Sequence, residues 1–164
     1  MNKITKNKIT IAFGLAGWMA LVYLVAWIAA QFSPGIAPAD WYNSINKPSW
    51  NPPSWVFGPV WSTLYTLMAI SAWIVWKDYG FRNAGTTLFI FLTQLLLNGL
   101  WSIIFFGMNS LSGALIEILI LLVFISLTIR AFHTKSKTAA WLMVPYFCWV
   151  AFATVLTLAI YLLN

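Results

Sequence analysis

Tryptophan is the residue type whose number and spacing stand out in this sequence of 164 residues, which contains 11 Trp, 6 Tyr and 12 Phe. The densest stretch is Trp41–Trp61, WYNSINKPSWNPPSWVFGPVW, which also carries four prolines. Its tryptophans are Trp41, Trp50, Trp55 and Trp61. Proline fixes φ and restricts the residue before it, so Asn46–Pro53 is expected to be extended or turned, with a helix following it. Indole rings on a stiff segment form a rigid contact surface.

Two amides and two rings form a second group, in which Gln94, Asn98, Trp101 and Phe105 are spaced i, i+4, i+7 and i+11. This spacing places them on one stripe of a helix. An unpaired amide is costly in lipid, so the stripe is expected to face other helices or a cavity. Hydrogen bonding between helices and cavity lining are both compatible with the spacing.

A third group consists of Tyr146, Trp149 and Ala153, spaced i, i+3 and i+7. Two large rings with polar tips beside a small residue form either a concave face or a packed aromatic core. If the helices bundle with the Trp/Pro-rich segment as a lid, aromatic rings of all three groups converge near the outer half of the bundle: Trp41, Trp50, Trp61, Trp101, Tyr146 and Trp149. Such a pocket suits a large, flat, apolar ligand with polar edges.

Residues for other chemistry are sparse. Glu117 is the only ionisable residue well inside an expected span, and structural hydrogen bonding is favoured over a functional carboxyl because no acidic or basic partner shares a span with it. His133 and Cys148 are the single histidine and cysteine, and neither has a partner for a metal site or a Cys/His nucleophile. No metal or organic cofactor is therefore expected.

The composition, 62% hydrophobic and 7% charged, is that of a membrane protein. Apolar runs of about 20 residues, each able to cross a hydrocarbon core of about 30 Å, lie at residues 9–32, 54–76, 84–106, 111–131 and 139–163. The predicted fold is an all-α integral membrane bundle of five transmembrane helices in a single domain, 1–164. The loop 33–53 between the first two helices is expected to cover a pocket.

The formal charge of +6 is explained by membrane topology. On the five-helix map all but one of the basic residues fall on one side: Lys3, Lys6, Lys8, Lys77, Arg82, Arg130, Lys135 and Lys137. Only Lys47 falls on the other side. The positive-inside rule therefore predicts a cytoplasmic N-terminus, with the C-terminus and loop 33–53 on the outer face. No nucleic-acid partner is expected.

Several motifs together carry a resemblance that covers nearly the whole chain. They are W-Y at 41–42, K-P-S-W-N-P-P at 47–53, F-G-P-V-W at 57–61, Q-x-x-x-N-x-x-W at 94–101 and P-Y-x-x-W-x-x-F-A-T at 145–154. With these motifs the chain resembles a bacterial-type member of the translocator protein/tryptophan-rich sensory protein (TspO/MBR) family, formerly called peripheral-type benzodiazepine receptors.

The resemblance implies a five-helix bundle, usually a homodimer, whose pocket binds tetrapyrroles such as protoporphyrin IX and haem. It also implies binding of synthetic isoquinoline carboxamides and benzodiazepines, and in bacterial members light-dependent oxidative degradation of protoporphyrin at pocket tryptophans. Carried over by motif, these tryptophans are Trp61 and Trp149. The residues implied to line the site are Trp41, Trp50, Tyr65, Asn98, Trp101, Tyr146, Phe152 and Ala153.

The function expected from the resemblance is membrane tetrapyrrole binding with light-dependent oxidative degradation of protoporphyrin IX and a regulatory or sensory role. The alternative is a transmembrane transporter of porphyrins or steroid-like hydrophobic ligands, with Gln94, Asn98 and Glu117 along its path. No inverted repeat or matching pair of broken helices supports transport. Thr157 and the absence of an Arg after Tyr161 depart from the family's steroid-recognition segment.

Overall fold

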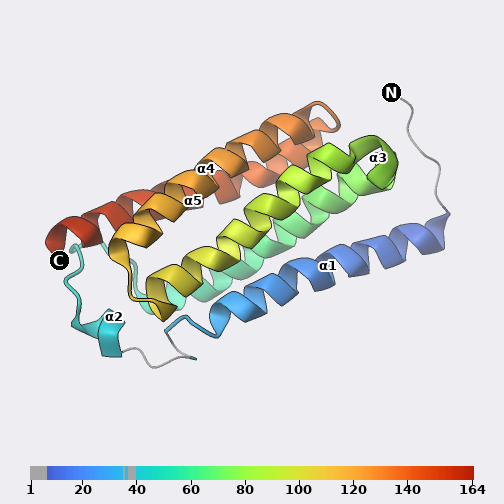
Figure 1. Cartoon of the computed structure of the whole chain (residues 1–164). Helices are drawn as coiled ribbons and strands as arrows, with labels where there is room; N and C mark the ends of the chain where they lie inside the picture. Colours follow the sequence, from blue (N-terminus) through green and yellow to red (C-terminus); the bar gives the residue numbers. More distant parts are fainter. Residues whose placement is uncertain (1–6, 35, 37–39) are drawn as a thin grey trace.

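The computed structural model describes residues 7–34, 36 and 40–164, and in this part of the chain the secondary structure is helical without extended strands. Lys3, Lys6 and residues 35 and 37–39 of the loop between the first two predicted helices lie outside the described residues. Long helices run alongside one another in a bundle, and short helical turns lie at one end (Figure 1).

The first long helix, α1, spans Lys8–Ala30. Asn7 caps its N-terminus: the Asn7 side-chain oxygen accepts a hydrogen bond of 2.7 Å from the backbone N–H of Thr10. The short helix α2, Asp40–Ser44, and the 3₁₀ turn η1, Ser54–Val56, lie between α1 and the next long helix.

Helix α3, Phe57–Ser102, is a hairpin of two antiparallel arms (Figure 1). The chain reverses at Gly80, with φ 64° and ψ 177°, a backbone conformation essentially restricted to glycine. Ala84 also leaves helical geometry, with φ −129° and ψ 18°. The second arm ends in one π-helical turn, η2, Ile103–Gly107. The two arms correspond to the predicted spans 54–76 and 84–106.

The last two helices are α4, Leu111–His133, and α5, Lys137–Leu163. Both have serine N-caps: Ser110 accepts from the N–H of Gly113, and Ser136 from that of Ala139. Pro145 lies inside α5 without ending the helix. The short connection between α4 and α5 makes them antiparallel neighbours (Figure 1).

Among the described residues, four helical stretches are long and apolar enough to cross a membrane: Lys8–Ala30, Ser54–Gly107, Leu111–His133 and Lys137–Leu163. Because Ser54–Gly107 doubles back at Gly80, it supplies two crossings. The predicted all-α integral membrane bundle is thus confirmed, whereas the covering role of the loop and the pocket beneath it stay predictions.

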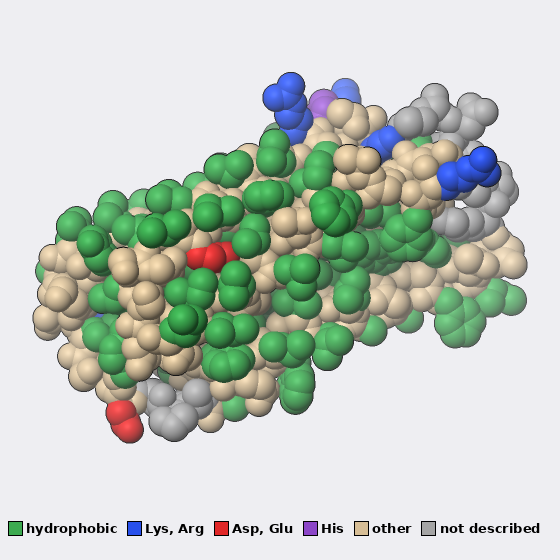
Figure 2. All heavy atoms as spheres, viewed as in Figure 1, with side chains coloured by type: hydrophobic (Ala, Val, Ile, Leu, Met, Phe, Trp, Pro, Cys, Tyr) green, Lys and Arg blue, Asp and Glu red, His purple; other side chains and the backbone are tan. Residues whose placement is uncertain are grey.

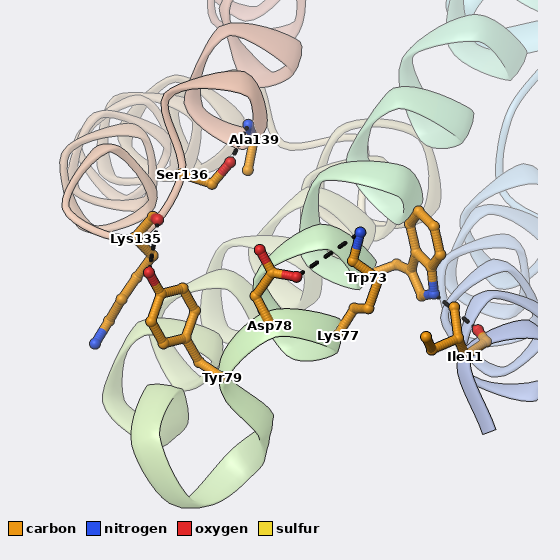
Figure 3. Close-up of polar contacts among 8 residues, drawn as sticks. All are labelled: Ile11, Trp73, Lys77, Asp78, Tyr79, Lys135, Ser136 and Ala139. Carbon is orange, nitrogen blue, oxygen red and sulfur yellow. Dashed lines mark hydrogen bonds and ion pairs between the residues drawn. The ribbon is translucent and has the colours of Figure 1, made fainter. Parts of the chain in front are cut away.

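Basic side chains gather at one end of the molecule (Figure 2). Figure 3 shows how the α3 turn and the α4–α5 turn meet there, with the Tyr79 hydroxyl donating to the Lys135 carbonyl at 3.1 Å. The Lys135 ammonium in turn donates to the carbonyl of Asn83 at 3.0 Å. Lys47 lies outside this end, in the segment before η1, where its ammonium donates to the Ile45 carbonyl. This distribution fits the predicted topology, but the side of the membrane that each end faces stays a prediction.

Candidate functional site

A chain of hydrogen bonds between buried side chains joins both arms of α3 to α5. The Tyr65 hydroxyl donates to Asn98 Oδ1 at 2.6 Å, and Asn98 Nδ2 donates to the Tyr146 hydroxyl at 3.1 Å. Asn98 is 4% exposed and Tyr146 is 0% exposed. The sequence left open whether the amides bond to other helices or line a cavity. Asn98 forms hydrogen bonds between helices, and these bonds hold both arms of α3 against α5.

Trp61 lies one helical turn from Tyr65 and packs directly on this hydrogen-bonded group. Its ring stacks on Tyr65 with centroids 5.3 Å apart and meets the edge of Tyr146 at 6.2 Å. Trp61 is only partly buried, so part of its ring is left free of these contacts. The F-G-P-V-W motif thus places an indole at the junction of α3 and α5.

Trp149 extends the aromatic group along α5, one turn beyond Tyr146. Its ring meets Phe57 from the start of α3 at 5.9 Å and Phe152 on its own helix at 5.5 Å. Phe152 in turn meets the ring of Trp50 at 6.0 Å. Trp149 is therefore connected both to the helix that carries Trp61 and to the segment that precedes it. Ala153, one turn further on, is partly buried against the same core.

A further aromatic group lies where α3 ends. Trp101 stacks on Phe105 with centroids 4.8 Å apart and an interplanar angle of 19°. The ring of Trp41, on α2, meets the Phe105 ring edge-on, with centroids 5.6 Å apart and an interplanar angle of 73°. The π-helical turn that contains Phe105 shifts the side-chain register at this point. Trp41 is thus brought onto the helix that carries Trp101.

The predicted residues therefore come together in the half of the bundle that contains α2, but as connected groups of rings. In the described chain the rings of Trp61 and Trp149 do not contact each other directly. Two hollows of about 480 and 390 Å³ lie elsewhere, one around Asn109–Ser112 and Asn164 and the other between α1 and the second arm of α3. Neither is lined by Trp61 or Trp149. The pocket at these tryptophans stays a prediction.

Gln94 and Glu117 are buried polar residues with unmet hydrogen-bonding capacity. Gln94 is 0% exposed, its Nε2 lies 4.0 Å from Met68 Sδ, and its Oε1 has no partner among the described residues. Glu117 is 5% exposed, and neither carboxyl oxygen has a hydrogen-bond partner in the described part of the chain. The structural hydrogen bond favoured for Glu117 from the sequence is thus not found among these residues.

The described residues contain no group of three or more His, Cys, Asp and Glu side chains that could hold a metal ion. Cys148 is a free, exposed thiol. The buried Trp101 Nε1–H, which has no acceptor among the described residues, is a donor suited to the polar edge of a ligand.

The structure adds two rings to the site that were not assigned to it from the sequence. Phe57, which the sequence analysis names only within the F-G-P-V-W motif, carries the contact between α3 and Trp149. Phe105, which helical spacing placed on one stripe with Trp101, joins Trp41 to Trp101. Phe57 lies four residues before Trp61, so helical spacing is the signal that could have included it in the site.

The sequence matches known proteins over most of its length. The model of the TspO/MBR family matches residues 12–163. The chain belongs to the TspO/MBR family. The TspO tryptophan-rich protein of Chlorobaculum tepidum is 41% identical over 152 residues, which cover 92% of this chain and 95% of that protein.

Other TspO/MBR relatives include both bacterial and animal proteins. The tryptophan-rich sensory protein of Cereibacter sphaeroides is 36% identical over 149 residues, which cover 90% of this chain and 92% of that protein. The translocator protein of Homo sapiens is 40% identical over 123 residues, which cover 74% of this chain and 73% of that protein. The resemblance inferred from the tryptophan and proline motifs is confirmed, and with it the assignment to an integral membrane family.

Proposed function

We propose that this TspO/MBR protein binds tetrapyrroles such as protoporphyrin IX and haem in the half of the bundle that contains α2, and that it promotes light-dependent oxidative degradation of protoporphyrin IX. Trp61 and Trp149 are the catalytic residues of this proposal. Light and dioxygen supply the oxidising power, and no metal or organic cofactor takes part. A regulatory or sensory role accompanies binding, in line with the name of the Cereibacter sphaeroides relative.

The observation that supports the proposal is that both indoles lie close to Tyr146, one on α3 and one on α5. Trp61 meets the Tyr146 ring from α3, and Trp149 follows Tyr146 by one turn of α5. Both indoles are partly buried. A planar macrocycle stacked between α3 and α5 would contact both, because flat apolar rings favour offset stacking on indole.

The remaining predicted residues give the proposed site its walls. Trp41 and Trp50 lie on the side of α2 and η1, and Trp101 contributes an N–H without an acceptor in the described chain. The hydrogen-bonded Tyr65, Asn98 and Tyr146 form a rigid polar floor. Such a site, mostly aromatic with a few polar groups, is typical of pockets for flat ligands. Isoquinoline carboxamide and benzodiazepine-type compounds are proposed to occupy it as well.

The test compares photobleaching of protoporphyrin IX bound to two double variants. Trp61→Phe/Trp149→Phe is expected to abolish bleaching under illumination while the fold, measured by circular dichroism, is unchanged. The matched control, Trp27→Phe/Trp141→Phe, changes two tryptophans that are 62% and 69% exposed and should bleach like the wild type. Undiminished bleaching by the first variant would refute the assignment of Trp61 and Trp149.

A homodimer is proposed as the functional assembly, as in the family resemblance. Residues 84–106 lack a clean G-x-x-x-G motif, so this proposal places no interface on the second arm of α3. Molecular mass measured in nanodiscs tests this assembly, and a monomer at all concentrations would contradict it.

Transport of porphyrins or steroid-like ligands is the second candidate. The unpartnered oxygens of Gln94 and Glu117 favour it, because a path through lipid needs polar groups. Against it, the region around Phe91 and Phe132 is closed by rings stacked 5.7 Å apart, both 0% exposed. Uptake of a porphyrin into sealed vesicles containing the purified protein distinguishes transport from binding.

A further inference from the structure

One exposed basic residue on each long helix of the described chain lies at the same end of the bundle. This set, called the basic rim below, consists of Lys8 of α1, Arg82 of α3, Arg130 of α4 and Lys137 of α5. The end lies opposite α2 (Figure 1), and Figure 2 shows basic side chains gathered on it. Among the described residues it carries six basic side chains and one carboxylate, that of Asp78. Little of its positive charge is therefore neutralised within the described chain.

The other two basic side chains at this end are engaged within the protein. The Lys77 ammonium lies 3.7 Å from Asp78 Oδ1 and 4.9 Å from the centroid of the Trp73 ring, and Figure 3 shows the three side chains together. The Lys135 ammonium donates to the Asn83 carbonyl at 3.0 Å. By contrast, no ion pair engages a residue of the basic rim in the described chain. The charges of the rim are thus available to a partner.

The basic rim lies where the helices leave the apolar layer. Lys8 and Lys137 are the first residues of α1 and α5. Arg130 is in the last turn of α4, and Arg82 follows the reversal of α3 at Gly80. Long basic side chains at such positions keep their stems against apolar surface and extend their charged groups into the headgroup layer. The depth of the rim is therefore that of lipid phosphates.

Exposed rings accompany two residues of the rim and support this depth. Trp141 is one turn further along α5 than Lys137, and Phe81 directly precedes Arg82. An exposed indole is typical of the boundary between hydrocarbon and headgroups. The connection between α4 and α5 is only residues 134–136, so it offers little surface beyond the headgroups for a soluble protein. The position of the rim therefore favours lipid over a protein partner.

We propose that the basic rim binds the phosphate groups of anionic phospholipids in the leaflet that this end of the bundle faces. Guanidinium groups suit this role because they donate parallel hydrogen bonds to phosphate oxygens, and ammonium groups add point charges. The rim lies at the end opposite the proposed tetrapyrrole site, and its test uses no tetrapyrrole, so either proposal can fail while the other holds.

Native mass spectrometry of the purified protein in detergent tests the rim, with phosphatidylglycerol and phosphatidylcholine of the same acyl chains as probes. Orientation in a bilayer does not enter this measurement, so a change of topology cannot mimic a loss of binding. Because one cation near anionic lipid changes affinity roughly fivefold, the wild type should prefer phosphatidylglycerol roughly tenfold or more. The variant Arg82→Gln/Arg130→Gln/Lys137→Gln should lose most of this preference. In the wild type the preference should weaken as the salt concentration rises.

Two double variants separate the rim from the net charge of this end. Arg82→Gln/Lys137→Gln should reduce the preference roughly fivefold or more. Lys77→Gln/Lys135→Gln removes the same charge, but its ammonium groups are engaged within the protein, so it should reduce the preference less than roughly twofold. If circular dichroism shows that a multiple variant is unfolded, the single variants Arg82→Gln and Lys137→Gln replace it, each with an expected loss of roughly twofold to fivefold.

Equal affinity of the wild type for the two lipids would overturn the proposal. An equal loss in the two double variants would also overturn it, because net charge and not the rim would then determine the preference. Binding of a polyglutamate peptide by a wild type that does not distinguish the lipids would overturn it in favour of an acidic protein partner.

Discussion

Replacing Asn98 by Leu is the most informative perturbation of the bundle, because Asn98 alone connects the buried hydroxyls of Tyr65 and Tyr146. Asn and Leu are similar in size, so the change removes two hydrogen bonds and leaves little empty volume. An interhelical hydrogen bond in a membrane protein is worth about 0.6 kcal/mol on average, whereas a buried polar group left unsatisfied costs about 1–3 kcal/mol. For two bonds the loss lies between about 1 and about 6 kcal/mol.

We expect a loss of about 2 kcal/mol in the free energy of unfolding, toward the lower end because the unfolded state in lipid also finds hydrogen-bond partners. The assay is reversible unfolding in mixed micelles, followed by far-UV circular dichroism. The triple variant Tyr65→Phe/Asn98→Leu/Tyr146→Phe removes every polar group of the set, so it should regain most of this loss. A triple variant as unstable as Asn98→Leu would refute the reasoning, because packing and not hydrogen bonding would then determine the cost.

Three further predictions concern backbone and packing. Gly14→Ala should destabilise the protein by about 2 kcal/mol, because a Cβ at this position of α1 overlaps the Trp76 ring of α3. Gly17→Ala, with open space around its Cβ, should be neutral or stabilising. Equal unfolding midpoints for the two variants would contradict this prediction. Gly80→Ala should cost about 2 kcal/mol at the α3 hairpin because of its positive φ, and a wild-type unfolding free energy would argue against the turn. Glu117→Leu should leave the free energy of unfolding unchanged or raise it by about 1 kcal/mol, because it removes a buried carboxyl that has no hydrogen-bond partner in the described chain. A loss above about 2 kcal/mol would indicate that this carboxyl has a partner.

The spans could be predicted because crossing lipid requires about 20 apolar residues, and such runs are legible in the sequence. The turn between the second and third spans was predicted less accurately than the spans themselves. The first arm of α3 continues beyond residue 76 to Tyr79, and the chain reversal depends on the backbone of Gly80. The π-helical turn η2 had no legible signal, since its apolar residues suit α-helical and π-helical bonding equally.

The candidate residues were predictable from motifs, but their partners were not. Helical spacing placed Asn98 on an inward stripe, whereas its bonds to Tyr65 and Tyr146 depend on the register between helices. The contact between Asn46 and Asn164 joins residues 118 positions apart and follows no local pattern. In the same way, Trp61 and Trp149 could be assigned to one region, while their separate ring contacts required the structure.

The central claim is that Trp61 and Trp149 bind one ligand together. The most direct test measures the dissociation constant of protoporphyrin IX for Trp61→Leu, for Trp149→Leu and for the control Trp27→Leu. Each variant is titrated in nanodiscs, and binding is followed by porphyrin absorbance. Each of the first two changes is predicted to weaken binding by twofold to roughly tenfold, as expected for loss of one aromatic stacking contact, and the control to leave it unchanged. Equal dissociation constants for all three variants and the wild type would contradict the shared site.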